Sequence, residues 1–263
     1  MVDVDGYDRL ELLGQGGFAV VYRAYQPSLD RYVALKVFLT EIDDSAGRKR
    51  FDREIRLLAR VSDHPNIVSV LDSGFTRDGR PYLAMPLYTR GTLAGLLAEQ
   101  GPMAYEGVLR IGVKLSSALT TLHDSGIVHG DIKPQNVLLN TYGEVALSDF
   151  GMARVIQSDE GEIGDLGFTS AYAPPEALEG RHVGPPGDVY GLASTLYTCR
   201  TGQQLRPDPG GSLLEAIQER PGSEPALSES IEPALRMTLK RALANSPQVR
   251  PTAAGLAADL SCG

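Results

Sequence analysis

The decisive stretch reads His129-Gly130-Asp131-Ile132-Lys133-Pro134-Gln135-Asn136, and Asp149-Phe150-Gly151 follows it further along the chain. Asp131 can orient a hydroxyl nucleophile, and Lys133 can place a cation beside a phosphate. The side-chain oxygens of Asn136 and Asp149 are hard ligands of the kind that Mg²⁺ prefers. Because phosphoryl transfer needs all of these groups, their occurrence in this order and spacing indicates that chemistry.

Two motifs nearer the N-terminus fit the same chemistry, although each alone is a weaker signal. The run Gly14-Gln15-Gly16-Gly17-Phe18-Ala19-Val20-Val21 lies between two strand-like segments, where glycines let backbone N–H groups approach phosphate oxygens. The run Val33-Ala34-Leu35-Lys36 places a lysine at the end of a β-branched strand. Glu54, on the helix expected next, is a carboxylate that could hold Lys36 toward phosphates. A solvated surface position is the alternative for both side chains.

The chain changes character near its first third, which indicates two parts. The first part predicts strands over residues 7–13, 19–25 and 31–38, a helix over 48–61, and strands over 67–71 and 82–85. After a hinge at 86–91, long helical patterns occupy residues 106–124, 187–200, 231–244 and 252–260. A strand-and-loop region over 127–176 separates the first two of these helices, and residues 206–211 and 220–230 are expected to form surface loops.

Composition limits the function classes further. The 263 residues suffice for one large domain or two packed lobes, and the net charge of −8 argues against general affinity for nucleic acid or an anionic membrane. The two cysteines, Cys199 and Cys262, form neither a disulfide framework nor a metal cluster. The acidic start lacks the apolar core of a signal peptide, and no apolar run is long enough to span a bilayer. We therefore expect a cytoplasmic location, without nucleic-acid binding or membrane contact from this segment.

Taken together, the motifs resemble the Hanks-type (eukaryotic-like) bacterial serine/threonine protein kinase domain over nearly the whole chain. The phrases at 26–31, 64–68 and 244–247 resemble actinobacterial members in particular. The resemblance implies an α+β, two-lobed fold that binds ATP between the lobes. Residues 1–86 would form a small, mainly antiparallel β lobe with one helix, and residues 87–263 a larger, mainly helical lobe. The implied activity is transfer of the γ-phosphate of ATP to serine or threonine hydroxyls of protein substrates.

The resemblance also assigns roles residue by residue. The catalytic set would be Asp131, Lys133, Lys36, Glu54 and Thr169, with Thr169 forming a hydrogen bond near Asp131 and Lys133. The nucleotide would be bound by Leu13, Gly14, Gly16, Gly17, Val21, Ala34, Lys36, Met85, Leu87 and Leu138. Asn136 and Asp149 would hold Mg²⁺, with Mn²⁺ as a possible substitute.

Several positions outside the catalytic set match the family, and three depart from it. Residues 172–176 resemble the end of the activation segment, Asp188 would accept backbone hydrogen bonds from the catalytic loop, and Glu176 would form a buried ion pair with Arg250. Ala19 and Pro174 are mild departures. Gly130 matters more, because this position is usually an arginine that often binds a phosphate on the activation segment, so the chain is of the type that lacks this arginine.

Two other functions fit part of this pattern. His-Gly-Asp with a following asparagine is also the signature of small-molecule phosphotransferases, although Lys133-Pro134, residues 172–176 and Asp188 favour a protein kinase. A pseudokinase that binds nucleotide and scaffolds partners is the other alternative, since motifs do not prove an assembled geometry.

Overall fold

The structure is a computed structural model that describes residues 2–42, 44–149, 170–206 and 225–262. The chain divides into two compact units, each with a core of its own. The first unit contains the described residues up to Thr89, and the second contains those from Arg90 onward. Each unit is described by itself.

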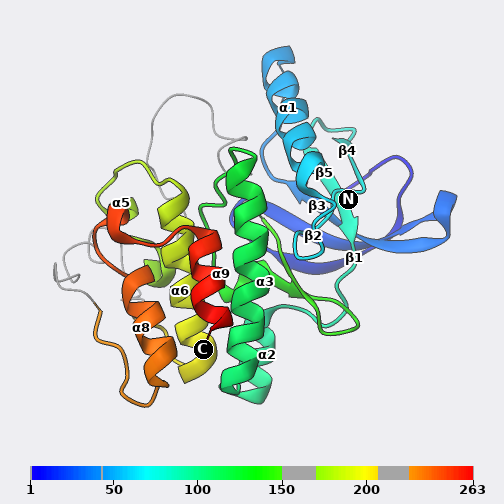
Figure 1. The fold of residues 1–263 in the computed structure, drawn as a ribbon. Helices are drawn as coiled ribbons and strands as arrows, with labels where there is room; N and C mark the ends of the chain where they lie inside the picture. Colours follow the sequence, from blue (N-terminus) through cyan, green and yellow to red (C-terminus); the bar gives the residue numbers. More distant parts are fainter. Residues whose placement is uncertain (1, 43, 150–169, 207–224, 263) are drawn as a thin grey trace. The chain divides into compact units, whose positions relative to one another are not determined.

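The first unit is built on a five-stranded antiparallel sheet with the strand order β1-β2-β3-β5-β4 (Figure 1). The strands are β1 (Asp8–Gln15), β2 (Ala19–Gln26), β3 (Arg31–Phe38), β4 (Asp72–Phe75) and β5 (Pro81–Pro86). In the central strand β3, every residue from Val33 to Phe38 is buried, because both faces of the strand are covered. Val33, Leu35 and Val37 pack on one face with Tyr7 and Tyr82.

The helix α1 (Ser45–Val61) covers the other face of β3 through aromatic contacts. The rings of Phe51 and Phe38 meet edge to face, with centroids 6.4 Å apart. The Asp44 carboxylate caps the helix by accepting a hydrogen bond from the Gly47 N–H group. Phe51, Ile55 and Leu58 are buried at helical spacing, so the pattern read from the sequence predicts both the helix and its inner face.

The strand expected over residues 67–71 is wrong, because the fourth strand begins at Asp72. Ile67 and Val68 are buried. The Leu71 N–H group donates to the Ala84 carbonyl of β5 at 2.8 Å, whereas Ser69 and Val70 bond to Ser62 at the end of α1. The Val70 N–H group donates to the Ser62 Oγ atom at 3.3 Å, and the Ser69 hydroxyl donates to the Ser62 carbonyl at 2.8 Å. Periodicity therefore identified buried residues but not their backbone partners.

The second unit is mainly helical (Figure 1). Its helices are α2 (Leu93–Gln100), α3 (Tyr105–Asp124), the short α5 (Pro175–Leu178), α6 (Pro185–Thr201), α8 (Pro233–Ala242) and α9 (Ala253–Ser261). The strands β6 (Val137–Leu139) and β7 (Val145–Leu147) form an antiparallel pair beside them. Every residue of α6 from Gly187 to Cys199 is buried, and α6 contacts α3, α8 and α9. This helix is therefore the centre of the unit.

The fold class expected from the sequence is confirmed: a small antiparallel sheet with one helix precedes a larger helical unit. The four predicted long helices all form, with ends shifted by one or two residues. The helix α2 was not predicted, because its eight residues are too few for a clear period. Residues 225–230 form no helix or strand, as expected for a loop, while the other residues of the predicted loop at 220–230 lie outside the described part of the chain.

Candidate active site

Asp131 lies in the loop before β6, where two neighbours hold one of its carboxylate oxygens. The Lys133 Nζ atom is 2.8 Å from Asp131 Oδ2, and the Asn136 Nδ2 atom donates to the same oxygen at 2.9 Å. Asn136 Nδ2 also donates to the Asp131 carbonyl at 2.7 Å. Because Pro134–Asn136 forms a single 3-10 turn, these side chains meet although they are two to five residues apart. The sequence prediction that groups Asp131, Lys133 and Asn136 is therefore matched by direct contacts.

The backbone of this loop is fixed by Asp188 on α6. Its carboxylate is only 1% exposed and accepts hydrogen bonds from the N–H groups of His129 at 2.9 Å and Gly130 at 2.8 Å. The Nε2 atom of His123, at the end of α3, lies 2.8 Å from the same carboxylate. A buried carboxylate must be satisfied by such donors. The expected role of Asp188 is thus confirmed, whereas His123 is a third partner that no motif identified.

His129 joins the loop to the end of β7. The Asp131 N–H group donates to His129 Nδ1 at 3.3 Å, so His129 Nε2 must carry the proton that it shares with the Ser148 carbonyl at 2.9 Å. Ser148 in turn donates from its N–H group and its hydroxyl to the Asn136 carbonyl, at 2.9 and 3.0 Å. The residue after Ser148 is Asp149, so these bonds place Asp149 directly after a segment bonded to Asn136.

Asp149 has an exposed side chain and a φ of 65°, a left-handed conformation that non-glycine residues rarely adopt. Such strain is most often found at functional positions. The Asn136 amide nitrogen donates a hydrogen bond to Asp131, so the amide oxygen can still serve as a hard metal ligand. The Asp149 carboxylate offers further oxygen ligands. These residues fit a magnesium ion that keeps water and phosphate ligands.

No group of three or more His, Cys, Asp or Glu side chains that could hold a metal occurs within the described ranges. Phe150, Gly151 and the expected catalytic residue Thr169 lie outside those ranges.

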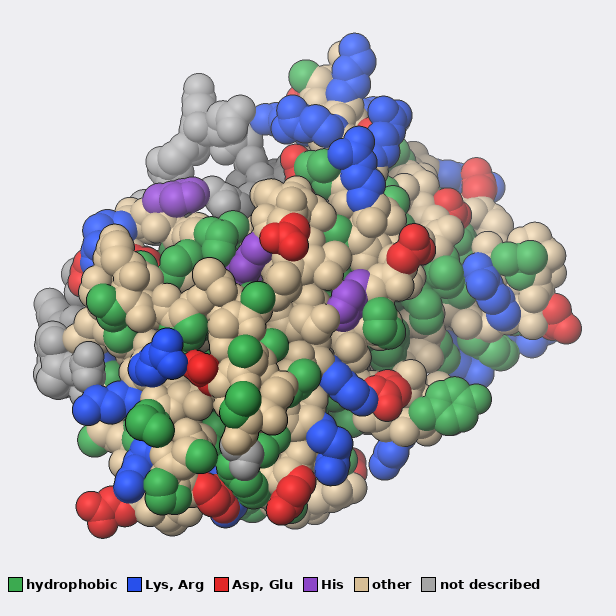
Figure 2. Space-filling model, in the orientation of Figure 1, with side chains coloured by type: hydrophobic (Ala, Val, Ile, Leu, Met, Phe, Trp, Pro, Cys, Tyr) green, Lys and Arg blue, Asp and Glu red, His purple; other side chains and the backbone are tan. Residues whose placement is uncertain are grey.

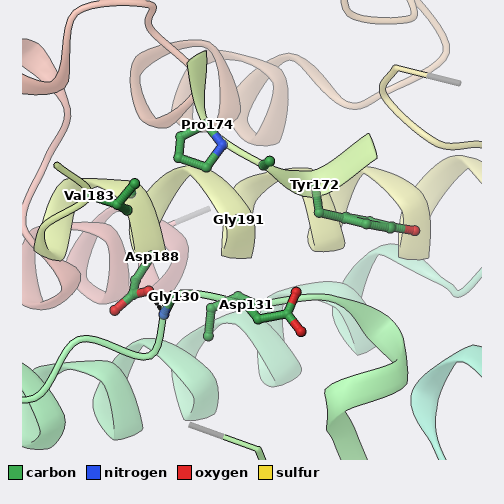
Figure 3. A pocket seen from close by; sticks show the side chains of 10 residues that line it. Gly130, Asp131, Tyr172, Pro174, Val183, Asp188 and Gly191 are labelled. Atoms are coloured by element: carbon green, nitrogen blue, oxygen red, sulfur yellow. Dashed lines mark hydrogen bonds between the residues drawn. The ribbon is translucent and has the colours of Figure 1, made fainter. Parts of the chain in front are cut away.

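Beside Asp131 the surface is hollowed where Gly130 stands (Figure 3). Gly130 has a φ of 79°, and a Cβ atom built on it would meet nothing within 4 Å. Figure 3 shows Gly130 and Asp131 on one side of the hollow and Tyr172, Pro174 and Val183 on the other. Leaving out a side chain at position 130 thus opens space next to the candidate catalytic carboxylate.

The ion pair expected between Glu176 and Arg250 is confirmed. Arg250 Nη1 and Nη2 lie 2.7 and 2.8 Å from the two Glu176 carboxylate oxygens, and both side chains are almost fully buried. Arg250 also donates to the carbonyls of Ala244, Pro186 and Asn245. The pair fixes α5, and with it the end of the segment that lines the hollow.

In the first unit, several expected nucleotide-binding residues lie on adjacent strands. Lys36 is opposite Val21, and Ala34 is opposite Met85, in the register of β2, β3 and β5. Lys36 is 9% exposed, with its Nζ atom 5.5 Å from the centre of the Phe38 ring. Gly14, near the end of β1, is exposed, as are Gly16 and Gly17 in the β1–β2 turn. The Gly16 N–H group donates to the Ala19 carbonyl at 2.9 Å. Of the remaining expected contacts, Leu13 is exposed and Leu87 is half-buried, both in this unit. Leu138 is also half-buried and belongs to the second unit.

The expected contact between Lys36 and Glu54 stays a prediction. Glu54 lies on α1, and the ion pair recorded for its carboxylate joins Oε1 to Arg53 Nη2 at 3.5 Å. Both side chains of this pair reach solvent, so the contact is weak.

A five-stranded antiparallel sheet unit, a helical unit and the contacts of the Asp131 loop are each features of a protein kinase. A family model described as "Protein kinase domain" matches residues 7–259, so the chain belongs to the protein kinase domain family. Serine/threonine-protein kinase PknK of Mycobacterium tuberculosis is 40% identical over 259 residues, which cover 97% of this chain and 23% of that protein. Serine/threonine-protein kinase PksC of Streptomyces coelicolor is 37% identical, over 93% of this chain and 46% of its own length. A probable serine/threonine-protein kinase of Clostridium perfringens is 33% identical, over 97% of this chain and 38% of its own length.

The chain thus spans less than half the length of each of these relatives. The resemblance to actinobacterial serine/threonine kinases that the sequence motifs indicated is confirmed by the Mycobacterium and Streptomyces relatives. None of the described helices is long and apolar enough to cross a membrane.

Proposed function

We propose that this chain transfers the γ-phosphate of ATP to serine or threonine hydroxyls of protein substrates. The observation that supports it best is the Asp131 loop, in which one carboxylate oxygen binds Lys133 and Asn136 while Asp188 holds the backbone. A general base must first lie in a fixed position, and the contacts of this loop support such a role for Asp131. The relatives named above are serine/threonine-protein kinases, which favours the same acceptor here.

The proposed catalytic roles follow from charge and position. Asp131 would orient the substrate hydroxyl and accept its proton, and Lys133 would offset negative charge on the transferred phosphoryl group. Lys36 would bind the α- and β-phosphates and Glu54 would orient Lys36. Thr169 would assist near Asp131 and Lys133.

ATP would be bound by residues of both proposed lobes, 1–86 and 87–263. The exposed Gly14, Gly16 and Gly17 would donate backbone N–H groups to phosphates. Apolar side chains would contact the adenine and its surroundings: Leu13, Val21, Ala34, Met85, Leu87 and Leu138.

Asn136 and Asp149 would hold Mg²⁺, or Mn²⁺ in its place. Bound there, the ion would supply positive charge that offsets the negative charge developing during transfer. The protein's own part would be to hold the two ligands in place, and the bonds from Ser148 to the Asn136 carbonyl support this.

The partners we propose are ATP and proteins that carry serine or threonine, with no nucleic-acid or membrane contact from this segment and a cytoplasmic location. The net charge of −8 supports the exclusion of polyanions in general.

The test is incorporation of radiolabelled phosphate from ATP into a generic protein substrate, compared between the wild type and Asp131→Asn. We expect the substitution to reduce turnover by about a thousandfold, the scale of loss when a proton-accepting group is removed. Circular dichroism should show the same fold for both. Phosphoamino-acid analysis should find phosphoserine and phosphothreonine. Nucleotide binding without transfer by the wild type would instead indicate a pseudokinase, and mainly phosphotyrosine would contradict the acceptor.

A further inference from the structure

The outward face of α1 carries a stripe of basic side chains. Lys49, Arg53, Arg56 and Arg60 are spaced four, three and four residues apart, so they share one face of the helix. All four are exposed, on the side opposite the buried Phe51, Ile55 and Leu58. At 1.5 Å per residue, this basic stripe is roughly 16 Å long. Figure 2 shows Lys and Arg side chains gathered over α1.

The charge of the basic stripe is not compensated within the described structure. The helix holds six basic and two acidic residues, in a chain of net charge −8. Arg53 is paired with Glu54 at 3.5 Å, but Lys49, Arg56 and Arg60 have no ion-pair partner among the described residues. Like charges three and four residues apart destabilise a helix. The stripe is thus not explained by the stability of the helix itself.

The chemistry of the basic stripe favours an acidic protein segment over other polyanions. None of the exposed large hydrophobic side chains among the described residues lies on α1, and the apolar face of the helix is buried against the sheet. The stripe therefore lacks the apolar side that a membrane-surface helix inserts and the aromatic rings on which single-stranded bases stack. An extended polyanion would also be repelled by the negative charge on the rest of the chain. A short acidic segment would interact mainly with the basic side chains within a Debye length of it.

We propose that the basic stripe of α1 is a docking surface for an acidic segment of a partner protein, with carboxylates spread along one helix length. Exposed charges attract such a segment over about a Debye length, roughly 8 Å at physiological salt. The stripe contains none of the residues assigned to the transfer reaction. Its occupation can therefore be tested without ATP, and the outcome does not depend on the proposed kinase activity.

The experiment measures binding of a fluorescein-labelled peptide of eight glutamates by fluorescence anisotropy. The test variant is Lys49→Gln with Arg56→Gln and Arg60→Gln, which spares Arg53 because it contacts Glu54. The control variant removes the same charge from three basic side chains of the second unit that lack an ion pair in the described structure: Arg110→Gln, Arg236→Gln and Lys240→Gln. Circular dichroism checks both folds, and the single change Arg60→Gln replaces the triple variant if that one unfolds.

We expect the wild type and the control to bind the peptide with equal affinity, and the test variant to bind about tenfold more weakly, since each exposed ion pair contributes little by itself. Affinity should fall as salt is raised from about 50 to about 300 mM. Equal binding by the test and control variants would overturn the proposal. So would stripe-dependent binding that is tighter to phosphatidylserine vesicles or to a single-stranded oligonucleotide than to the peptide, or stripe-dependent self-association in sedimentation velocity.

Discussion

At the residue scale, the Asp188 carboxylate is the group on which the candidate active site depends. It accepts from the backbone of His129 and Gly130 and from the His123 ring. Replacing His123 by alanine should leave the buried carboxylate with one donor fewer, which costs about 1–3 kcal/mol of unfolding free energy. Because His123 does not touch Asp131, the effect on turnover should come through loop position.

The measurement pairs urea unfolding with initial rates for His123→Ala and His123→Gln. We expect the alanine variant to lower kcat with KM for ATP unchanged, and glutamine, which can still donate a hydrogen bond, to recover most of the loss. If His123→Ala and His123→Gln lose stability and kcat equally, His123 acts by packing and not by donating to Asp188.

The two cysteines should differ sharply in reactivity. Burial raises the pKa of the Cys199 thiol, within α6, to about 12, whereas Cys262 is exposed. Since the thiolate is the reactive form, native protein at about pH 8 should react with a disulfide reagent at one thiol, and unfolded protein at two. A Cys262→Ser variant that still reacted quickly in the native state would contradict this.

Partial burial lowers the pKa of His64, between α1 and β4, below its ordinary value. Its Nδ1 atom accepts a hydrogen bond from the Asn66 N–H group at 3.1 Å, which a protonated ring could not do. The folded state therefore resists protonation more than the unfolded state. The contribution to stability is present above the ordinary histidine pKa of about 6.5 and is lost as pH falls through the lower folded value.

The melting temperature should accordingly fall between about pH 7.5 and about pH 5.5. His64→Asn keeps an acceptor at the same place without a titrating group, so its decrease should be smaller. An equal decrease in both proteins would assign the pH dependence to other groups.

At the element scale, α6 positions the Asp131 loop by close approach. A Cβ atom on Gly191 would lie 3.1 Å from the backbone oxygen of Ile132, the residue after Asp131. Gly191→Ala should push the loop outward and cost about 1–3 kcal/mol, the usual effect of overpacking. The matched control is Gly95→Ala in α2, where the nearest neighbour of the added carbon is the Thr92 hydroxyl at 3.6 Å.

Initial rates and melting temperatures should separate the two alanine variants. Gly191→Ala should reduce kcat severalfold while the chain stays folded, and Gly95→Ala should leave kcat unchanged. Normal turnover by Gly191→Ala would mean that the loop does not depend on contact with α6.

Some parts of the site and the fold could be predicted from the sequence, and others could not. Asp131, Lys133 and Asn136 could be grouped beforehand because phosphoryl transfer restricts the residue types and the loop restricts their spacing. His123 could not, because its bond to Asp188 joins residues 65 positions apart and no short motif contains both. Residues 67–71 were mistaken for a strand because burial and strand pairing give the same apolar pattern.

At the scale of the whole molecule, the pair Glu176–Arg250 joins residues 74 positions apart and lies in the interior. The Arg250 side chain is 0% exposed and the Glu176 side chain 3% exposed. Removing one partner of a buried pair leaves an uncompensated charge, which typically costs about 3–5 kcal/mol. Such a loss is a large part of the stability of most domains.

We therefore expect Glu176→Gln to lower the midpoint of urea unfolding strongly. Glutamine keeps the shape of the glutamate side chain, so the loss comes from removing the charge opposite Arg250. The control is Arg241→Gln, which breaks the exposed pair with Asp259 at 2.8 Å and should cost less than about 1 kcal/mol. Arg250→Met should be at least as damaging as Glu176→Gln, because Arg250 also bonds to the carbonyls of Ala244, Pro186 and Asn245. Similar midpoints for Glu176→Gln and Arg241→Gln would show that the three carbonyls, and not the carboxylate, compensate the buried guanidinium.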